Sequence, residues 1–173
     1  MKIRKESKEV SFIYGDLVSL NKKLISNLIL KCEKSYHKKS RYCFHRDIKS
    51  KVQEMIICHK KGYYVRPHKH LDKEESIFVI KGKAKAIFFN DSGNIKHIID
   101  LGDLKSKKCF YYKLNSKYFH TLIIQSKYFI FHEVSGGPFK KNMTKFANWS
   151  PDKKNSIFNK NLNKKIKLYE KNF

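Results

Sequence analysis

The chain has 173 residues, 40% of them hydrophobic, and a formal net charge of +24. This length suits one domain with flanking segments, and the content of Phe, Tyr and Ile favours strands. No stretch approaches the roughly 18 consecutive apolar residues of a membrane span, and the basic start is not followed by the apolar run of a secretory signal. We therefore expect a cytoplasmic protein with no membrane span.

The positive charge comes mainly from lysine, because only Arg4, Arg41, Arg46 and Arg66 are arginine among the 39 basic residues. Proteins that read nucleic acids rely on arginine for bidentate contacts to phosphate and guanine. The lysines are also dispersed along the chain rather than clustered. We expect no specific nucleic-acid partner.

The first predicted element is an amphipathic helix between Ser19 and Lys34. Apolar residues recur there at spacings of three and four, and Ser19 is a candidate for the N-cap. Residues 35–51 are polar and irregular, which predicts a connecting segment. Residues 1–51 are thus expected to form a helix and a connection that pack on the domain that follows.

Residues 52–151 are expected to form a β-barrel. Short apolar or alternating runs, separated by turn residues, are typical of β-sandwiches and barrels. In residues 83–88 lysines alternate with apolar residues, so one face should lie in water and the other in the core. Tight turns leave no room for crossover helices, so the strands should be mainly antiparallel. The predicted strands are residues 53–58, 63–66, 76–80, 83–90, 95–100, 108–114, 120–125 and 128–134.

The C-terminal residues 152–173 are rich in lysine and asparagine. Their apolar residues, such as Ile157, Phe158 and Leu168, look isolated. A segment of this composition buries little apolar surface. We expect a loosely packed, flexible tail.

The pattern G-x5-HxH-x4-E-x6-G spans residues 62–82 and contains His68, His70 and Glu75. Histidines at i and i+2 of a strand project to the same side, about 6 to 7 Å apart, and can reach one ion at about 2.1 Å each. Glu75 should open the next strand, where antiparallel pairing can bring it beside the imidazoles, whereas Glu74 would face the opposite side. Imidazoles with a carboxylate suit Fe, Mn, Ni or Zn. We expect one divalent transition-metal ion; the alternative is a set of surface histidines on a basic loop.

This pattern resembles the first motif of the cupin superfamily. The resemblance implies an all-β fold, the cupin double-stranded β-helix or jelly-roll barrel, here with an N-terminal α-helix. The second cupin motif carries one more histidine, which corresponds to His120. The Pro and Gly of its turn are replaced by Asn115 and Lys117, and its Asn by Ile124. We assign His120 as the fourth metal ligand.

A closer resemblance extends over most of the chain to about residue 151. Besides the helix and Val52-Gln53, the segments that carry it are Arg41–His45, Tyr64–His70, Phe119–Thr121, Gly137–Phe139 and Phe146–Pro151. With these segments the chain looks like the WbuC family of cupin-fold metalloproteins, whose genes lie in bacterial surface-polysaccharide (O-antigen) clusters. The resemblance implies a metal and a pathway but no particular reaction, and it is compatible with a homodimer, since cupins commonly pair through exposed strands.

Three further residues are candidates for catalysis. Arg66 should share a face with the HxH histidines and could hold a phosphate or carboxylate, or else form a salt bridge at the barrel mouth. His45 could move a proton near neutral pH or be a hydrogen-bonded structural residue. Tyr64 shares the face of Arg66 and could instead pack in the core. His132 is less favoured as a pocket residue. His37, His59 and His97 are interpreted as surface residues.

These patterns together predict a metal-dependent cupin that acts on a sugar, nucleotide sugar or similar small polar molecule. The metal would act as a Lewis acid beside a proton-moving side chain, which suits isomerase or epimerase chemistry. An iron-dependent oxygenase is an alternative, and so is a non-catalytic sugar-binding or regulatory cupin with a structural metal. Whether the chain is an enzyme stays open.

Overall fold

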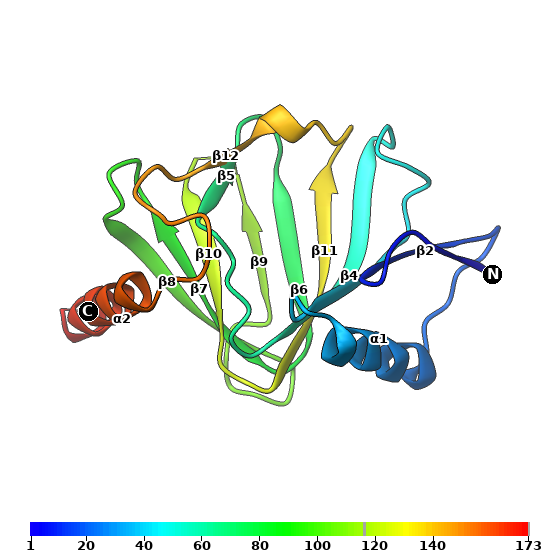
Figure 1. The fold of residues 1–173 in the computed structure, drawn as a ribbon, viewed down its shortest axis with the longest axis horizontal. Helices are drawn as coiled ribbons and strands as arrows, with labels where there is room; N and C mark the ends of the chain where they lie inside the picture. The colour runs from blue at the N-terminus through cyan, green and yellow to red at the C-terminus, as the bar shows by residue number, and fades with distance from the viewer. Residues whose placement is uncertain (116, 173) are drawn as a thin grey trace.

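The computed structural model describes residues 1–115 and 117–172, and this part of the chain forms two β-sheets and two long helices (Figure 1). The seven-stranded sheet has the order β1-β2-β3-β4-β11-β6-β9, and the five-stranded sheet has the order β12-β5-β10-β7-β8. The strands of the first sheet are β1 (Lys2–Lys5), β2 (Val10–Tyr14), β3 (Lys39–Cys43), β4 (Val52–Lys60), β11 (Tyr128–Gly136), β6 (Glu75–Lys81) and β9 (Tyr111–Leu114). Those of the second are β12 (Thr144–Phe146), β5 (His68–His70), β10 (Phe119–Ile124), β7 (Lys83–Phe89) and β8 (Ile95–Gly102).

The two sheets enclose the main core between them. Ile77 and Phe131 from the seven-stranded sheet and Ala86 and Leu122 from the five-stranded sheet belong to one cluster of buried side chains. Strand alternation is as predicted in β7, where Ala84 and Ala86 are buried while the neighbouring lysines are not. The facing sheets therefore form the predicted barrel-like all-β architecture.

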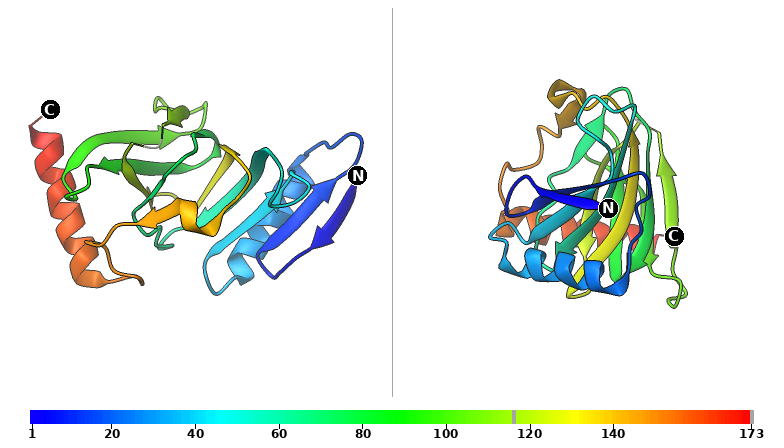
Figure 2. Two further views of the ribbon diagram at one scale, coloured as in Figure 1. Left: turned by 90° about the horizontal axis from the view of Figure 1, so that it is seen from above. Right: turned by 90° about the vertical axis from the view of Figure 1, so that its right-hand side faces the viewer.

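Each sheet is covered on its outer face by one helix. Helix α1 (Lys22–Lys34) packs on β3 and β4, and α2 (Ser156–Lys171) packs on β8. The two helices, and with them the two chain termini, lie toward opposite ends of the molecule (Figures 1 and 2). The order of layers is thus helix, seven-stranded sheet, five-stranded sheet, helix.

Helix α1 buries the stripe Leu24, Leu28 and Cys32, spaced by four residues as the sequence predicts. Its N-cap is Asn21, whose side chain accepts a hydrogen bond from the Leu24 N–H at 3.1 Å. The prediction of a Ser19 cap was therefore wrong by two residues. The amide oxygen of Asn21 fills the same role that the Ser19 hydroxyl would have had.

The N-terminal region is more structured than predicted. Residues 35–51 contain β3, and β1 and β2 extend the same sheet. β2 and β3 are a parallel pair, joined through α1 as a crossover helix, whereas the named strands of the barrel pair antiparallel. Residues 1–51 therefore enlarge the sheet as well as supplying a helix to its outer face.

The strand predicted over residues 63–66 is absent, and β5 lies just beyond it. Pro67 has no N–H to donate to a ladder, so regular pairing starts only after it. The residues before Pro67 are still held, because Thr121 Oγ1 donates to the Val65 carbonyl at 2.5 Å. The shift moves the regular strand onto the HxH motif itself.

The hairpin between β6 and β7 requires a glycine at position 82. Gly82 has φ of +92°, and a Cβ there would lie 2.2 Å from the Tyr128 carbonyl oxygen. An L-residue with a side chain is strained at such a φ and would also clash. The second glycine of the motif thus closes β6 at a defined residue.

Helix α2 replaces the flexible tail expected for residues 152–173. Asn155 caps it by accepting from the Phe158 N–H at 2.9 Å. Leu162 and Ile166 are buried on the five-stranded sheet, with Phe158 packed beside them. These three residues follow a spacing of four, so a single apolar stripe is enough to dock an otherwise polar helix.

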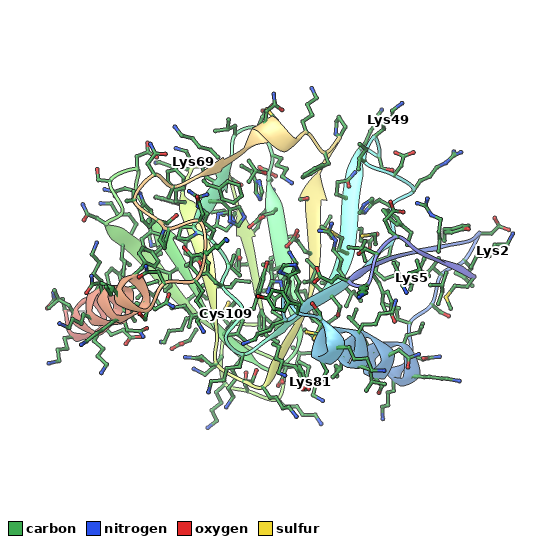
Figure 3. The ribbon with its side chains drawn as sticks, in the orientation of Figure 1. Lys2, Lys5, Lys49, Lys69, Lys81 and Cys109 are labelled. Carbon is green, nitrogen blue, oxygen red and sulfur yellow. The ribbon has the colours of Figure 1, made fainter. Side chains whose placement is uncertain are left out.

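Lysines are spread over the whole molecule rather than gathered on one face. Figure 3 labels Lys2 and Lys5 on the N-terminal strands, Lys49 and Lys69 near the upper edge and Lys81 at the lower edge. Among the described residues, no helix is both long and apolar enough to cross a membrane.

Candidate metal centre

Three histidines come together on the inner face of the five-stranded sheet. His68 and His70 are the two ends of β5, and His120 of β10 is the direct antiparallel partner of His68. One ligand atom from each of the three rings lies within 4.8 Å of the others. Strand pairing thus joins the HxH motif to a histidine far along the sequence.

Glu75 reaches the histidines from the opposite sheet. Its Oε2 lies 3.1 Å from His70 Nε2 and its Oε1 lies 3.0 Å from His120 Nε2. β6 pairs with β9 and β11, not with β5, so the expected pairing of the two motif strands is corrected to an approach across the interior. Glu74 faces outwards, as predicted, and forms an ion pair with Lys113.

The imidazoles of His68 and His120 are held by backbone carbonyls. Nδ1 of His68 donates to the Arg66 carbonyl oxygen at 2.8 Å, and Nδ1 of His120 donates to the Tyr118 carbonyl oxygen at 3.3 Å. With the proton on Nδ1, each neutral ring keeps its lone pair on Nε2. Such outer hydrogen bonds fix the tautomer and orientation of metal-binding histidines.

The third ring, His70, is held by a side chain from β12. Its Nδ1 lies 3.3 Å from Oγ1 of Thr144, which pairs with His70 in the sheet. We assign the proton to Nδ1, so that the hydroxyl accepts and Nε2 faces Glu75. All three imidazoles therefore share one arrangement, in which Nδ1 is bonded to the protein.

The donor set fits a divalent transition metal. An ionised carboxylate has only acceptors, so its contacts with two Nε2 lone pairs require a proton or a cation between the atoms. Two ligands about 2.1 Å from one ion lie about 3.0 to 3.4 Å apart, which matches the distances of 3.0 and 3.1 Å from Glu75 to His120 and His70. Imidazole nitrogens with a carboxylate oxygen suit Fe, Mn, Ni or Zn.

The pKa values of the site residues favour the binding of a cation. Burial opposes ionisation of Glu75, yet the charge of His120 and hydrogen bonds from His120 and His70 hold its pKa well below the usual range. Burial likewise works against protonation of His120, but Glu75 outweighs it and raises the pKa of that ring. Burial and the neighbouring His120 lower the pKa of His68 to about 3. Glu75 is thus ionised and His68 neutral at pH 7, the forms that bind metal.

A second carboxylate, Glu133 of β11, faces the same interior and was missed by sequence analysis. It follows Phe129 and Phe131 on the inward side of the strand, and both rings belong to the main core. Its carboxylate makes no hydrogen bond or ion pair with any of the residues described. Burial, with a smaller contribution from the charge of Glu75, raises the pKa of Glu133 to about 7.

Sequence analysis named the neighbour of Glu133, His132, only as a less favoured pocket residue. His132 faces outwards, where its Nε2 lies 2.9 Å from Glu54 Oε1. Alternation could not decide between them, because the outward face of β11 is also apolar: Ile130 is buried beneath α1. The only available signal was the phase set by Phe129 and Phe131.

Arg66 is engaged with the segment that follows β12. Its guanidinium forms an ion pair with Asp152, lies 4.8 Å from the centre of the Phe146 ring, and donates from Nε to Ser150 Oγ at 3.4 Å. Tyr64 donates to the carbonyl of the adjacent Pro151 at 3.0 Å. Both side chains therefore have structural partners at the barrel mouth.

Two further histidines are placed by their contacts. Nδ1 of His45 accepts from the Glu54 backbone N–H at 3.1 Å, and its ring packs against Phe12, which corresponds to the structural alternative. His59, interpreted as a surface residue, is only 8% exposed. It lies on the inward face of β4, because its contact with the Phe131 ring continues the core.

The two facing sheets, with the HxH-x4-E residues and His120 gathered between them, define a cupin-fold protein. A family model described as "Domain of unknown function (DUF6016)" matches residues 20–101. No curated protein matches the chain by sequence.

Solved structures share the fold. Capsular polysaccharide assembling protein CapF from Staphylococcus aureus is 20% identical, with a TM-score of 0.50 over 62% of this chain and 29% of that chain. Protein SO0799 from Shewanella oneidensis is 11% identical, with a TM-score of 0.55 over 70% of this chain and 82% of that chain. The chain thus spans less than a third of CapF, and at these identities the likeness shows the fold alone.

Proposed function

We propose that this chain is a metal-binding cupin of the WbuC type that acts on a sugar, nucleotide sugar or similar small polar molecule in bacterial surface-polysaccharide (O-antigen) biosynthesis. The observation that carries the proposal is the convergence of His68, His70, His120 and Glu75 inside the barrel. The resemblance of the sequence to the WbuC family supports the pathway. The fold shared with CapF, a protein named for capsular polysaccharide assembly, is compatible with it.

His68, His70, His120 and Glu75 would hold the ion. When bound, a divalent ion supplies Lewis-acid chemistry, polarising a carbonyl or hydroxyl oxygen of the substrate. The surrounding protein shields the inner side of the site from water, because Glu75 and His120 are each only 5% exposed, while His68 and His70 are half-buried. Charges act more strongly where water is excluded.

Glu133 is the residue that we propose moves a proton. Its carboxylate is unpaired among the described residues and faces the interior that Glu75 enters. A group whose pKa lies near the working pH can both remove and return a proton, and the pKa of Glu133 is raised to about 7. An isomerase or epimerase needs this reversible transfer at a carbon next to a polarised carbonyl.

The test is exchange of solvent deuterium into a panel of nucleotide sugars, read by mass spectrometry. Under anaerobic conditions, we expect the metal-loaded protein to introduce one deuterium into one nucleotide sugar of the panel. Glu133→Gln should abolish exchange while keeping the metal, and His70→Ala should abolish both. Glu74→Gln is the matched control, since Glu74 is an exposed carboxylate paired with Lys113, and it should exchange like the wild type.

Other results would favour the alternatives. Bound iron with oxygen consumption would indicate an oxygenase, because three imidazoles and one carboxylate also leave positions for oxygen. Binding of a sugar without exchange or oxygen consumption, together with loss of folding on metal removal, would indicate a non-catalytic cupin with a structural metal.

A further inference from the structure

A cavity lies on the inward face of the seven-stranded sheet, away from the metal centre. It has a volume of about 170 Å³, and its polar lining includes Lys39, Arg41, His59 and Tyr63. Along β11, the partner of Glu75 is Ser135 and the partner of His59 is Phe129. Six residues of strand separate them, or about 20 Å. β5 and the C-terminal end of β4 accordingly lie at opposite edges of the molecule (Figure 1).

His59 is a buried polar residue whose ring has no hydrogen-bond partner among the residues that the structure describes. Its side chain lines the cavity, and its Nδ1 is buried without a partner in the described part of the chain. The ring packs against Tyr63 and Phe131, with centroids 4.4 and 5.3 Å away. Leaving a buried polar atom unpaired costs about 1 to 3 kcal/mol.

The tautomer of His59 follows from this environment. Burial, followed by the charges of Lys39 and Arg41, lowers its pKa to about 3, so the ring is neutral at pH 7. A buried N–H without an acceptor is rarer in proteins than a bare acceptor. We therefore assign the lone pair to the buried Nδ1 and the proton to Nε2, which makes His59 a donor through Nε2.

Two cationic side chains, Lys39 and Arg41, lie beside His59. Lys39 and Arg41 alternate on β3 and are the ladder partners of His59 and Ile57. The Arg41 guanidinium forms no hydrogen bond or ion pair with the residues described. Nζ of Lys39 donates to the Tyr63 hydroxyl at 3.4 Å and has no carboxylate partner within the described residues.

One acidic residue also lines the cavity. Glu9 accepts a hydrogen bond from the Ser35 hydroxyl at 2.7 Å. With Lys39 and Arg41 positive and Glu9 negative, the lining keeps one net positive charge. Its free groups are therefore mostly donors: a guanidinium, an ammonium and an imidazole N–H.

We propose that this cavity binds a phosphate group, with Arg41 and Lys39 as cationic donors and His59 as a neutral donor. Donors from three residues suit an oxyanion with several acceptor oxygens. A water molecule occupies about 30 Å³ of liquid, so about 170 Å³ has room for inorganic phosphate or the phosphate end of a small molecule. Pockets for larger ligands usually start near 300 Å³, so this cavity is too small to enclose a whole nucleotide sugar.

Calorimetric titration with inorganic phosphate, at constant ionic strength and pH 7.5, tests the site. Arg41→Ala should weaken binding at least tenfold. Arg46→Ala is the matched control, because Arg46 is exposed and outside the cavity, and it should change affinity less than twofold. Equal losses in both variants would overturn the proposal, since they would reflect general attraction to a chain of charge +24.

His59→Phe gives an independent readout that does not depend on charge. It keeps the ring but removes both nitrogens, so the phosphate-free protein should melt at a higher temperature than the wild type. The same variant should bind phosphate at least tenfold more weakly. Wild-type phosphate affinity in His59→Phe would overturn the proposal.

Two further titrations test whether phosphate binds in this cavity or at the metal centre, and whether the ligand is free phosphate or a sugar phosphate. His70→Ala should bind phosphate like the wild type; loss of binding there would place the anion at the metal centre and overturn the second site. Glucose 1-phosphate is titrated in parallel. Tighter binding than inorganic phosphate would identify a sugar phosphate as the ligand, equal or weaker binding would identify free phosphate, and no binding of either would refute the site.

Discussion

The metal centre and the phosphate cavity differ in how the protein satisfies its own polar groups. At the metal centre, the Nδ1 atoms of His68 and His120 donate to backbone carbonyls and that of His70 contacts Thr144. At the cavity, Nδ1 of the buried His59 has no partner in the described part of the chain. In the first region the hydrogen bonds fix rings whose free Nε2 atoms point at one place. In the second region the donors proposed for the ligand are the Arg41 guanidinium, the Lys39 ammonium and the Nε2–H of His59, whereas the buried Nδ1 of His59 carries a lone pair.

The charges differ in the same sense. Glu75 and Glu133 bring two carboxylates to the interior near the histidines, while Lys39 and Arg41 bring two cations to the cavity. A site with fixed acceptors suits a cation, and a site with fixed donors suits an anion. One sheet therefore carries functional groups of opposite character toward its two ends.

The largest expected effect is the loss of a metal ligand. His70→Ala or Glu75→Ala should lower metal affinity at least a hundredfold, because each contributes a donor atom to the centre. His120→Gln, in a folded barrel, should lower it at least tenfold. Affinity is measured by competition with a chelator, and Glu74→Ala is the control because Glu74 is paired with Lys113 on the outside. Metal loss in Glu74→Ala alone would show that the strand register is wrong.

A smaller effect is expected from Glu133, through the dependence of stability on pH. The pKa of Glu133 is raised from 4.5 to about 7 in the folded protein, so the folded state binds this proton more tightly than the unfolded state. The stabilisation is complete below about pH 4.5 and is lost as the pH rises to about 7. Above that, Glu133 is a half-buried charge that costs on the order of 2 kcal/mol.

Glu133→Gln in metal-free protein should therefore raise the free energy of unfolding by about 2 kcal/mol at pH 8 and leave it nearly unchanged at pH 4.5. Urea denaturation at both pH values measures the difference. Glu74→Gln should show no such trend. A gain in Glu133→Gln that is equal at the two pH values would mean that packing, not ionisation, is responsible.

The next largest effect is expected from loss of the Thr144 hydroxyl, which orients His70. Thr144→Val keeps the shape of the side chain but removes the partner of His70 Nδ1, which lies 3.3 Å away. Outer partners of this kind are worth about 10- to 100-fold in metal affinity, and we expect a value near tenfold at this exposed edge strand. Thr144→Ser keeps a hydroxyl and should restore most of the affinity. Equal affinity in the Val and Ser variants would remove Thr144 from the metal centre.

Much of this arrangement was predictable, because local spacing carried it. His68 and His70 alternate on one strand, and Glu75 opens the next, so their common inward face follows from the period of two. His120 was assigned through the resemblance to the second cupin motif, at the start of a predicted strand. Their meeting point depended on a feature that spacing does not show: Glu75 crosses from the other sheet instead of pairing with β5.

Glu133 and helix α2 were missed for the same physical reason. In each case the pattern of apolar residues in the sequence fits more than one arrangement of the segment. Glu133 lies on a strand that is apolar on both faces, so its phase was hidden. Sequence analysis named Ile157, Phe158 and Leu168 as isolated apolar residues. Of these, Phe158 belongs to the stripe of α2, with Leu162 and Ile166, whereas Ile157 and Leu168 are 70% and 63% exposed. A helix with only a few apolar residues on one face, and a strand that is buried on both faces, can be oriented only when the tertiary structure is known.

The smallest expected effect concerns Arg66, which sequence analysis considered both as a ligand-binding residue and as a salt-bridge residue. Its guanidinium is 25% exposed and pairs with Asp152, which is 82% exposed, and it stacks on Phe146. An exposed ion pair is worth about 0 to 1 kcal/mol, and an exposed cation–π contact about 0.5 to 1 kcal/mol. Arg66→Ala should thus lower the free energy of unfolding by about 0.5 to 2 kcal/mol, and Asp152→Asn by about 0.5 kcal/mol, since the latter keeps the stacking. Neither change should alter metal affinity more than twofold, because Arg66 holds His68 through its backbone carbonyl and not through its side chain.

If Arg66→Ala leaves stability unchanged in urea denaturation but prevents binding of the sugar that exchanges deuterium, the guanidinium is a substrate contact, and the contacts with Asp152 and Phe146 only hold it in position.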